Sequence, residues 1–312
     1  MNIALDMMGG DFAPEELVKG VRDYLSEKKP ALVSLIGDEQ LLTPLLKQYE
    51  VPASAYRIVP TTEVIDMHEH PLKALKAKPN SSIAVGFGML AAGKTDAFIS
   101  AGNTGAMLIG SLYTIKPIEG VQRPTIGTIV PMENGNTGLL LDVGANADCK
   151  AEHLNQFATL GSLYAKYILG IENPRVGLIN IGEEEGKGNV LAQATYPLLK
   201  ENNEINFIGN VEGRDVFLDH ADVLVCEGFT GNVILKLAES LHGIMERQNV
   251  HTEYFDRFNF EDYGGTPVLG VNKPVIIGHG ISRAKAYKNM MLLAQKMIET
   301  QLLSKMAAAF QG

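Results

Sequence analysis

The sequence predicts an α/β protein whose sheet is largely parallel. Short apolar runs alternate with amphipathic stretches along all 312 residues, which is the pattern of repeated strand–helix units. Hydrophobic residues make up 46% of the chain, enough for a large core in one domain or in two lobes. No low-complexity tract or linker divides the chain, so we expect a single domain over residues 1–312.

Many of the expected strands end in Gly, Asn or Asp. In open α/β sheets ligands bind beyond the carboxyl ends of the strands, so these endings indicate where a site should lie. Ten apolar runs are expected to form strands: Ile3–Leu5, Leu32–Ile36, Arg57–Val59, Ala97–Ser100, Thr125–Val130, Gly138–Asp142, Val176–Ile181, Asn206–Ile208, Val223–Cys226 and Val275–Ile277.

Two helices have clear signals in the sequence. Pro14 followed by Glu15 and Glu16 is typical of a helix start, and we expect Asp11 to be its N-cap. The second helix follows Cys149, where apolar residues recur at intervals of three and four and predict one buried face. That face consists of Leu154, Phe157, Ala158, Gly161, Ala165 and Ile168.

The segment at about 233–263 interrupts the alternation of strands and helices. An amphipathic stretch from Val233 to Met245 is followed by an aromatic cluster that precedes Gly264 and Gly265. Packing onto the body of the protein is the default expectation, while a dimer interface, a cover for an acyl chain or a contact with a membrane surface remain open. The aromatic residues are Tyr254, Phe255, Phe258, Phe260 and Tyr263.

Charge and cysteine content narrow the function classes. The formal net charge of −9 argues against nucleic-acid binding, because the phosphate backbone favours a basic face. Residues 266–312 nevertheless carry a net charge of +5, which predicts either a basic face for an acidic partner or the solvated side of a terminal helix. Cys149 and Cys226 are too few for a disulfide framework. No export signal or membrane-spanning run is apparent, so we expect a cytoplasmic protein.

Four glycine-containing loops, each after an apolar run, predict anion-binding helix starts. Backbone N–H groups in the first turn of a helix lack intrahelical acceptors, and the helix dipole favours negative charge there. Several such loops in one chain suggest a cleft that binds phosphate. The loops are Ser100–Ala106, Gly182–Asn189, Gly228–Asn232 and Gly278–Ser282.

These loops belong to a longer ordered set of motifs. The set consists of Asp6-Met7-Met8-Gly9-Gly10-Asp11, Ser100-Ala101-Gly102-Asn103-Thr104-Gly105-Ala106, Leu141-Asp142-Val143-Gly144-Ala145-Asn146, Asn180-Ile181-Gly182-Glu183-Glu184, Lys187-Gly188-Asn189, Gly209-Asn210-Val211-Glu212-Gly213, Gly228-Phe229-Thr230-Gly231-Asn232 and Gly264-Gly265. Over nearly the whole chain, the set resembles the PlsX-type phosphate acyltransferases.

The resemblance implies an α/β/α sandwich of three layers, similar to phosphotransacetylase and to the isocitrate and isopropylmalate dehydrogenases. It also implies transfer of a long-chain fatty acyl group from acyl carrier protein to inorganic phosphate, giving acyl-phosphate for glycerophospholipid synthesis. A homodimer is implied, with no metal or cofactor. Transient contact with the inner face of the membrane, or with a downstream membrane acyltransferase, would suit this role.

The implied reaction depends on the positioning of phosphate and on the stabilisation of negative charge more than on proton transfer. Phosphate is already an oxyanion and a thiol is a good leaving group, so no nucleophilic serine or cysteine is required. We expect Lys187 to be a catalytic cation that faces phosphate. The expected phosphate-binding residues are Gly102, Asn103, Thr104, Gly105, Gly188 and Asn189.

Three further catalytic candidates lie in loops or at a helix start. His279 could donate to the oxyanion or protonate the leaving thiolate, with Ser282 as an orienting neighbour, and a structural role for His279 is equally expected. Asn232 and Lys236 stand one helical turn apart and offer an amide donor and an amine on one face.

Several acidic residues and one histidine pair have competing interpretations. Glu183 could orient Lys187 or be solvated, whereas the next two glutamates are expected to be solvated. Asp142 could orient a lysine, bind a metal or cap the following turn. His68-Glu69-His70 suggests zinc ligands, but the spacing matches no established site and Pro71 follows, which favours a surface turn.

Alternative functions remain at this point. A phosphotransacetylase-like enzyme would act on short acyl-coenzyme A, and a binding module would hold the acyl group or carrier protein without turnover. A metal- and nicotinamide-dependent hydroxyacid dehydrogenase would need arginines for substrate carboxylates, and few arginines lie near the loop motifs. The acyltransferase therefore ranks first and the dehydrogenase last.

Overall fold

The computed structural model describes residues 1–311. Contacts along the chain divide it into two compact units, each described here by itself. The first unit comprises Met1–Pro117 and Phe260–Leu303, and the second comprises Ile118–Asn259 with residues 304–311. The single domain over residues 1–312 that the sequence predicted stays a prediction.

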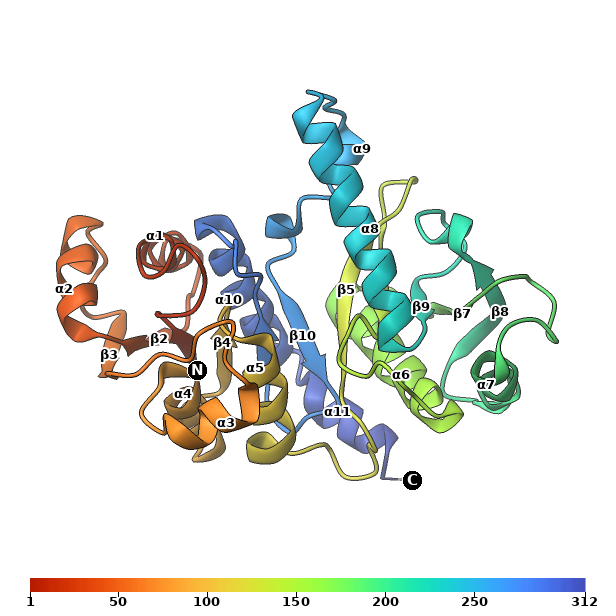
Figure 1. Ribbon diagram of the computed structural model, residues 1–312, viewed down its shortest axis with the longest axis horizontal. Coiled ribbons are helices and arrows are strands. Elements are labelled where there is room, and N and C mark those ends of the chain that lie inside the picture. The colour runs from red at the N-terminus through yellow and green to blue at the C-terminus, as the bar shows by residue number, and fades with distance from the viewer. Residues whose placement is uncertain (312) are drawn as a thin grey trace. The chain divides into compact units, whose positions relative to one another are not determined.

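The first unit is built on six strands, all parallel to their neighbours except β10. Figure 1 shows α1 and α10 together on one face of these strands and α4 with α5 on the other, so helices cover both faces. The strand order is β3 (Tyr56–Pro60), β2 (Leu32–Gly37), β1 (Asn2–Asp6), β4 (Ala97–Ser100), β11 (Val275–Ile277) and β10 (Thr266–Leu269). The helices are α1 (Glu15–Leu25), α2 (Glu39–Gln48), α3 (Pro71–Ala77), α4 (Ser82–Ala91), α5 (Thr104–Gly110), which continues as a π-helical turn (Ser111–Ile115), a short 3-10 turn (Phe260–Asp262) and α10 (Ala284–Glu299).

The second unit has five strands, of which β5 and β6 form an antiparallel pair and the others are parallel. Their order is β5 (Thr125–Pro131), β6 (Thr137–Leu141), β9 (Val223–Val225), β7 (Arg175–Asn180) and β8 (Asn206–Glu212). The helices are α6 (Ala151–Tyr164), which continues as a π-helical turn (Ala165–Leu169), α7 (Val190–Glu201), a 3-10 turn (Gly213–Asp215), α8 (Gly228–Arg247) and α9 (Glu253–Asp256), and α11 (Leu302–Ala309) is the last helix.

All ten predicted strands are present, and two local predictions need correction. The sequence missed β10, because this strand has only four residues and includes Pro267, a residue that rarely occurs inside strands. Asp11 is not the N-cap of α1, since Pro14 occupies that position, and the Asp11 N–H donates instead to the Gly280 carbonyl at 2.7 Å. The predicted face after Cys149 is buried along its whole length.

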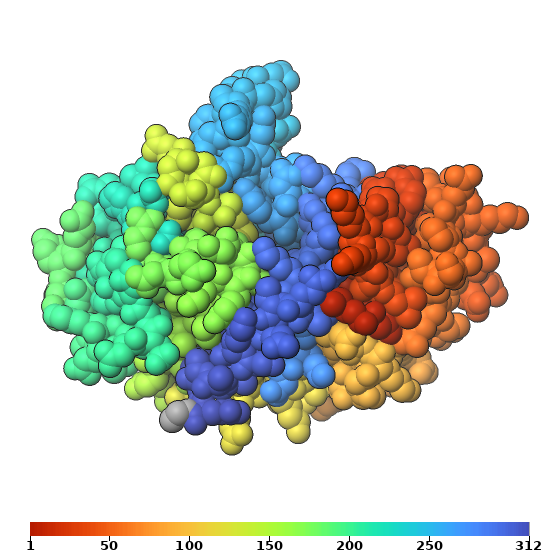
Figure 2. Space-filling view, turned by 180° about the vertical axis from the view of Figure 1, so that it is seen from behind, coloured from red at the N-terminus to blue at the C-terminus, as the bar shows by residue number. Residues whose placement is uncertain are grey.

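The aromatic cluster of the 233–263 segment packs largely against the second unit. The Tyr254 ring contacts the rings of Phe255 and Phe258, with centroids 5.5 and 5.4 Å apart. Phe258 also contacts Phe217 at 5.2 Å, and Arg257 donates to carbonyls in the turn between β5 and β6. Figure 2 shows this turn beside the 250s segment. Packing onto the body, the default expectation, therefore accounts for these three aromatic residues.

The basic C-terminal region is partly neutralised by acidic residues of the first unit. Lys285 pairs with Asp262, and Lys288 lies 2.5 Å from Glu27. Arg283 stacks over the Phe12 ring at 4.0 Å. Among residues 1–311, no helix has the length and apolarity needed to cross a bilayer.

Candidate active site

A buried carboxylate joins the ends of β1 and β4 in the first unit. Asp6 is 1% exposed and accepts hydrogen bonds from the Ser100 hydroxyl at 2.7 Å and the Met8 N–H at 2.9 Å. Burial raises the pKa of this carboxyl group. The Ser100 oxygen in turn accepts the N–H of Gly102 at 3.0 Å. Asp6 thus holds the start of the Gly102–Gly105 turn through Ser100, a role that the sequence reasoning missed although Asp6 opens the first motif.

The side chain of Asn103 is fully engaged in holding its own turn. Its Oδ1 accepts the N–H of Ala106 at 2.9 Å and caps α5, while Nδ2 donates to carbonyls of residues 66–69 at 2.9 to 3.3 Å. This leaves little capacity for a ligand. The phosphate interpretation of this turn therefore rests on the backbone N–H groups of Thr104 and Gly105, which have no protein acceptor within residues 1–311.

The His68–His70 segment forms a turn that leads into α3. Glu69 is ion-paired with Lys78, and the Glu69 carbonyl accepts a hydrogen bond from the Asn103 amide at 3.0 Å. A Cβ on Gly105 would lie 2.4 Å from Pro71 at the start of α3. Close packing between α3 and α5 thus explains a glycine at position 105, in addition to any ligand.

His279 and Ser282 belong to one tight turn after β11. The His279 ring packs on Phe260, with centroids 4.7 Å apart, and its carbonyl accepts the Ser282 N–H at 3.0 Å. The Ser282 hydroxyl is fully buried and has no hydrogen-bond partner within the described chain. A backbone hydrogen bond therefore holds the two residues in the same turn.

Side-chain amides hold the loop between β7 and α7 in the second unit. Asn180 Nδ2 donates to the Lys187 carbonyl at 3.1 Å, Gln193 donates to the carbonyl of Gly188 at 3.0 Å, and Asn210 donates to that of Glu184 at 2.9 Å. These bonds use the carbonyl oxygens of the loop. The N–H groups of Gly188 and its successor, by contrast, have no protein acceptor among residues 1–311.

The Lys187 ammonium group is not paired with the glutamates that precede it. Glu183 lies 3.7 Å from Arg214, and Glu185 pairs with Lys200 at 3.0 Å. No carboxylate of residues 1–311 lies within 4.0 Å of the Lys187 nitrogen. The contacts thus give no support to an orienting role for Glu183, and they leave an exposed cation at this loop.

Asn189 combines a helix cap with an exposed position. Its Oδ1 accepts the N–H of Ala192 at 2.8 Å, which caps α7 as expected for asparagine. Gly188 just before it has φ +95°, and a Cβ there would lie 2.2 Å from Asn180 Oδ1. Only glycine fits this position without moving the loop.

The Asp142 carboxylate binds the backbone of the turn that follows it. This buried carboxylate accepts the backbone N–H groups of Gly144, Ala145 and Asn146, each at 2.9 Å. Burial raises the pKa of this group. Of the three interpretations from the sequence, the contacts favour turn capping.

Asn232 lies against the Asp142 turn, whereas Lys236 does not. Asn232 Nδ2 donates to the Val143 carbonyl at 3.1 Å. The Lys236 ammonium pairs with Glu239 one turn further along α8, at 2.8 Å. The two side chains share a helix, but their partners differ.

The four predicted anion sites differ in the group that caps each helix. At α8 the Glu227 carboxylate accepts the N–H of Thr230 at 3.0 Å, and at α10 the Glu16 carboxylate accepts the first helical N–H at 3.0 Å. A carboxylate there satisfies the helix dipole and repels phosphate, which corrects the prediction for these two loops. Neutral amides, Asn103 and Asn189, cap α5 and α7.

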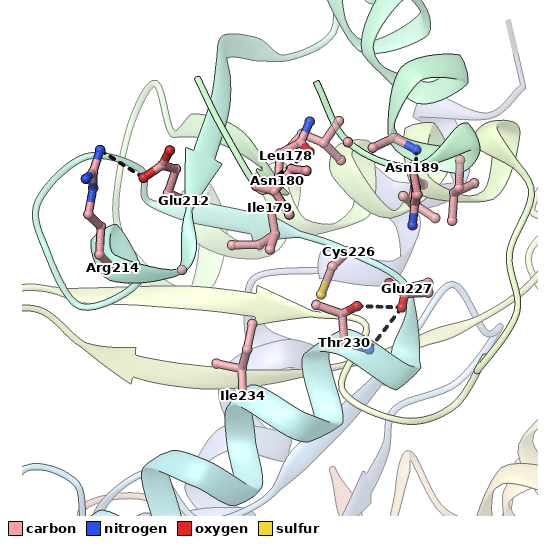
Figure 3. A pocket seen from close by; sticks show the side chains of 16 residues that line it. Leu178, Ile179, Asn180, Asn189, Glu212, Arg214, Cys226, Glu227, Thr230 and Ile234 are labelled. Atoms are coloured by element: carbon pink, nitrogen blue, oxygen red, sulfur yellow. Dashed lines mark hydrogen bonds and ion pairs between the residues drawn. The ribbon is translucent and has the colours of Figure 1, made fainter. Parts of the chain in front are cut away.

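A cavity of about 830 Å³ opens beside α7 and α8 in the second unit (Figure 3). Buried apolar side chains of α6, β7 and the segment after β9 form part of its wall, among them Leu154, Leu178 and Cys226. Glu212 pairs with Arg214 at 2.8 Å at one side of the cavity. The sequence did not predict this space, although the apolar residues around the motifs are typical of such a lining.

The structure distributes the predicted site residues between the two units. Residues from neighbouring motifs do meet within a unit, as Asn232 does with the Asp142 turn. The first unit contains Gly102, Asn103, Thr104, Gly105, His279 and Ser282, and the second contains Asp142, Glu183, Lys187, Gly188, Asn189, Asn232 and Lys236.

Comparison with known proteins assigns the family. A family model described as "Fatty acid synthesis protein" matches residues 1–305. The chain belongs to this family. It is 43% identical to a phosphate acyltransferase of Dictyoglomus thermophilum, over 98% of this chain and 96% of that protein. It is 44% identical to a phosphate acyltransferase of Aquifex aeolicus, with the same coverage.

Solved structures support the fold. A phosphotransacetylase from Streptococcus pyogenes aligns with a TM-score of 0.70 at 18% identity, covering 96% of this chain and 94% of that one. A branched-chain phosphotransacylase from Enterococcus faecalis V583 aligns with a TM-score of 0.64 at 14% identity, covering 96% and 99%. This family member therefore has the α/β/α fold that its motifs implied.

Proposed function

We propose that this chain transfers a long-chain fatty acyl group from acyl carrier protein to inorganic phosphate. One observation carries the proposal: Asn189, the neutral cap of α7, lines an apolar cavity and belongs to the same loop as the exposed Lys187. An anion and an acyl chain could bind next to each other there. The full-length relatives named phosphate acyltransferase support the same reaction class.

Phosphate would bind at the start of α7. The N–H groups of Gly188 and Asn189 lack protein acceptors within residues 1–311, and the helix dipole favours an anion at this end. Lys187 adds a full positive charge. The Thr104 and Gly105 N–H groups of the first unit are a second candidate for phosphate contact.

A phosphate oxygen would then attack the thioester carbon directly. The carbon–oxygen bond forms, a tetrahedral oxyanion collapses, and the carbon–sulfur bond breaks to release the carrier-protein thiolate, which takes a proton from solvent or from a side chain. Asn232 and Lys236 of the second unit are the candidate donors for the oxyanion or the thiolate. The catalytic role expected for His279 of the first unit stays a prediction from the sequence. Lys236 would have to leave Glu239 to act in this way.

The cysteines do not suit covalent catalysis. Burial raises the pKa of Cys149 to about 12, and burial raises that of Cys226 well above its usual value. Only a thiolate is an effective nucleophile. This supports direct transfer to phosphate without an acyl-enzyme.

The test is release of thiol from palmitoyl-acyl carrier protein with and without phosphate, with acyl-phosphate trapped as its hydroxamate. Phosphate-dependent release together with hydroxamate supports the transferase. Lys187→Ala should lower kcat/KM for phosphate by about a hundredfold, given the loss of a charge-assisted contact. Lys200→Ala is the matched control, because Lys200 pairs with Glu185.

Other outcomes of the same assay would support other functions. Turnover with acetyl-coenzyme A alone would favour a phosphotransacetylase-like enzyme, and carrier-protein binding without turnover would favour a binding module.

We also propose a homodimer that forms through α8. This helix exposes apolar residues at intervals of three and four, each 43–60% exposed, and a stripe of this kind usually marks an interaction surface. A cytoplasmic protein working at the inner face of the membrane would suit an acyl-phosphate product. The stripe consists of Val233, Leu237, Leu241 and Ile244.

A further inference from the structure

We infer that the 830 Å³ cavity of the second unit holds the acyl chain of the thioester, with Ile234 limiting its length. The inference rests on the proposed transferase and adds where the chain lies. Ligand pockets typically measure about 300–1,000 Å³, so the cavity is large enough for a long aliphatic chain.

The wall of the cavity suits methylene groups. Leu154, Leu178 and Cys226 are each at most 3% exposed and line it from three separate parts of the second unit. Ile181, which also lines the cavity, is 81% exposed. A bound chain would remove this surface from water.

Several polar side chains of the wall already have partners within the protein. Glu212 bonds Arg214, and the Thr230 hydroxyl donates to Glu227 at 2.6 Å. Asn180 bonds the backbone of the adjoining loop through both its oxygen and its nitrogen. A pantetheine arm or nucleotide would bring amides and hydroxyls that need partners, whereas an acyl chain needs none.

The position of the proposed phosphate site determines which end of the cavity would hold the thioester. In Figure 3, Asn189 and Glu227 lie on one side of the cavity, and Glu212 with Arg214 on the opposite side. Asn189 also caps α7, where phosphate is proposed to bind. The thioester would therefore lie at the Asn189 side, with the chain extending away from it.

A smaller cavity continues from the thioester end. It measures about 420 Å³ and shares Asn189, Leu191 and Glu227 with the larger one. Cys149 and the exposed Phe229 are among its other lining residues. This second space leaves room for the carrier-bound part of the substrate outside the acyl cavity.

Ile234 is the residue best placed to limit chain length. It projects from α8 into the lower part of the cavity in Figure 3 and is half-buried. A larger side chain there would shorten the space without touching the α7 cap or Lys187. Ile208 on β8 is the matched control, because it is exposed and does not line the cavity.

The test combines turnover and binding in the full-length protein. Acyl carrier proteins with 8 to 18 carbons are compared in wild type, Ile234→Phe, Ile234→Ala and Ile208→Phe, and binding of cis-parinaric acid, an 18-carbon fluorescent fatty acid, is titrated in each. In wild type, kcat/KM should rise about tenfold per two added methylenes until the cavity is full. Thermal melting confirms that each variant is folded.

Ile234→Phe should move the best substrate at least two carbons shorter and weaken parinarate binding about tenfold, while Ile208→Phe leaves both unchanged. Ile234→Ala should move the optimum towards longer chains, which keeps the test valid if the phenylalanine variant does not fold. Unchanged chain-length profiles in both Ile234 variants, with phosphate-dependent turnover intact, would overturn the cavity assignment alone. Absence of phosphate-dependent turnover in wild type would instead overturn the proposed transferase.

Discussion

Replacing Gly188 by alanine should disable phosphate use while the chain stays folded. Gly188 has φ +95°, and an added Cβ would lie 2.2 Å from Asn180 Oδ1 and 2.8 Å from the Ala192 Cβ. Cβ atoms in proteins essentially never come closer than 3.0 Å to such neighbours. Asn180 or the loop must therefore shift by about 1 Å.

The cost follows from the contacts that would change. A left-handed backbone costs a non-glycine residue about 1–2 kcal/mol. Moving Asn180 also loses its bonds to the Lys187 carbonyl and the Ile181 N–H, about 1 kcal/mol each. The total of about 3–4 kcal/mol is smaller than the usual 5–15 kcal/mol stability of a folded protein. A displacement of about 1 Å can nevertheless lower a rate about a hundredfold.

The assay is hydroxamate trapping of acyl-phosphate as a function of phosphate concentration, with thermal melting in parallel. Gly186→Ala is the control, because a Cβ at Gly186 meets nothing within 4 Å and the residue has no positive φ. We expect kcat/KM for phosphate to fall about a hundredfold in Gly188→Ala and to change little in Gly186→Ala. Equal kinetics in the two variants would refute the idea that the shape of this loop binds phosphate.

Three further outcomes are expected. Cys149→Ser should retain turnover. In the wild type, Cys149 should react slowly with iodoacetamide at pH 8, since burial raises its pKa to about 12. Loss of turnover in the variant, or an acyl group on Cys149 in mass spectra, would contradict direct transfer. Ser100→Ala removes a hydrogen bond that favours ionised Asp6, whose pKa burial raises above 3.8. Ionisation of Asp6 opposes folding, so stability from this group is present at low pH and lost as pH rises through the folded-state pKa. The decrease in melting temperature caused by Ser100→Ala should therefore be larger at pH 8 than at pH 4. An equal decrease at both pH values would argue against this role of the Ser100–Asp6 hydrogen bond. Leu237→Glu should convert the proposed dimer to a monomer in light scattering, and an unchanged mass would remove α8 from the interface.

Sequence patterns predicted the fold well where burial alone decides the structure. Most of the strands that the sequence marked are buried apolar runs, such as Ala97–Ser100, whose predicted bounds match β4. β10 escaped notice because its residues pair antiparallel to β11 and include a proline, so no local pattern sets it apart. Asp11 was assigned as a cap from its residue type, but the N-cap of α1 is Pro14, three residues later.

Sequence patterns predicted less of the site, because loop chemistry depends on distant partners. The residues around α10 do not indicate that the Glu16 carboxylate, far away in the sequence, accepts the first N–H of this helix. Glu183 was one candidate to orient Lys187, yet it lies 3.7 Å from Arg214. Local spacing identifies which residues stand in a loop, and only the folded chain shows which of their polar groups are already used.

The amides that hold the β7–α7 loop have a consequence for how activity depends on solution conditions. Asn180, Gln193 and Asn210 carry no charge at any ordinary pH, so the hydrogen bonds with which they hold the loop should persist in acid, in base and in concentrated salt. Inorganic phosphate, in contrast, changes its own charge near neutrality. The fall in rate at low pH should consequently follow the protonation of phosphate, and not a loss of these hydrogen bonds in the loop.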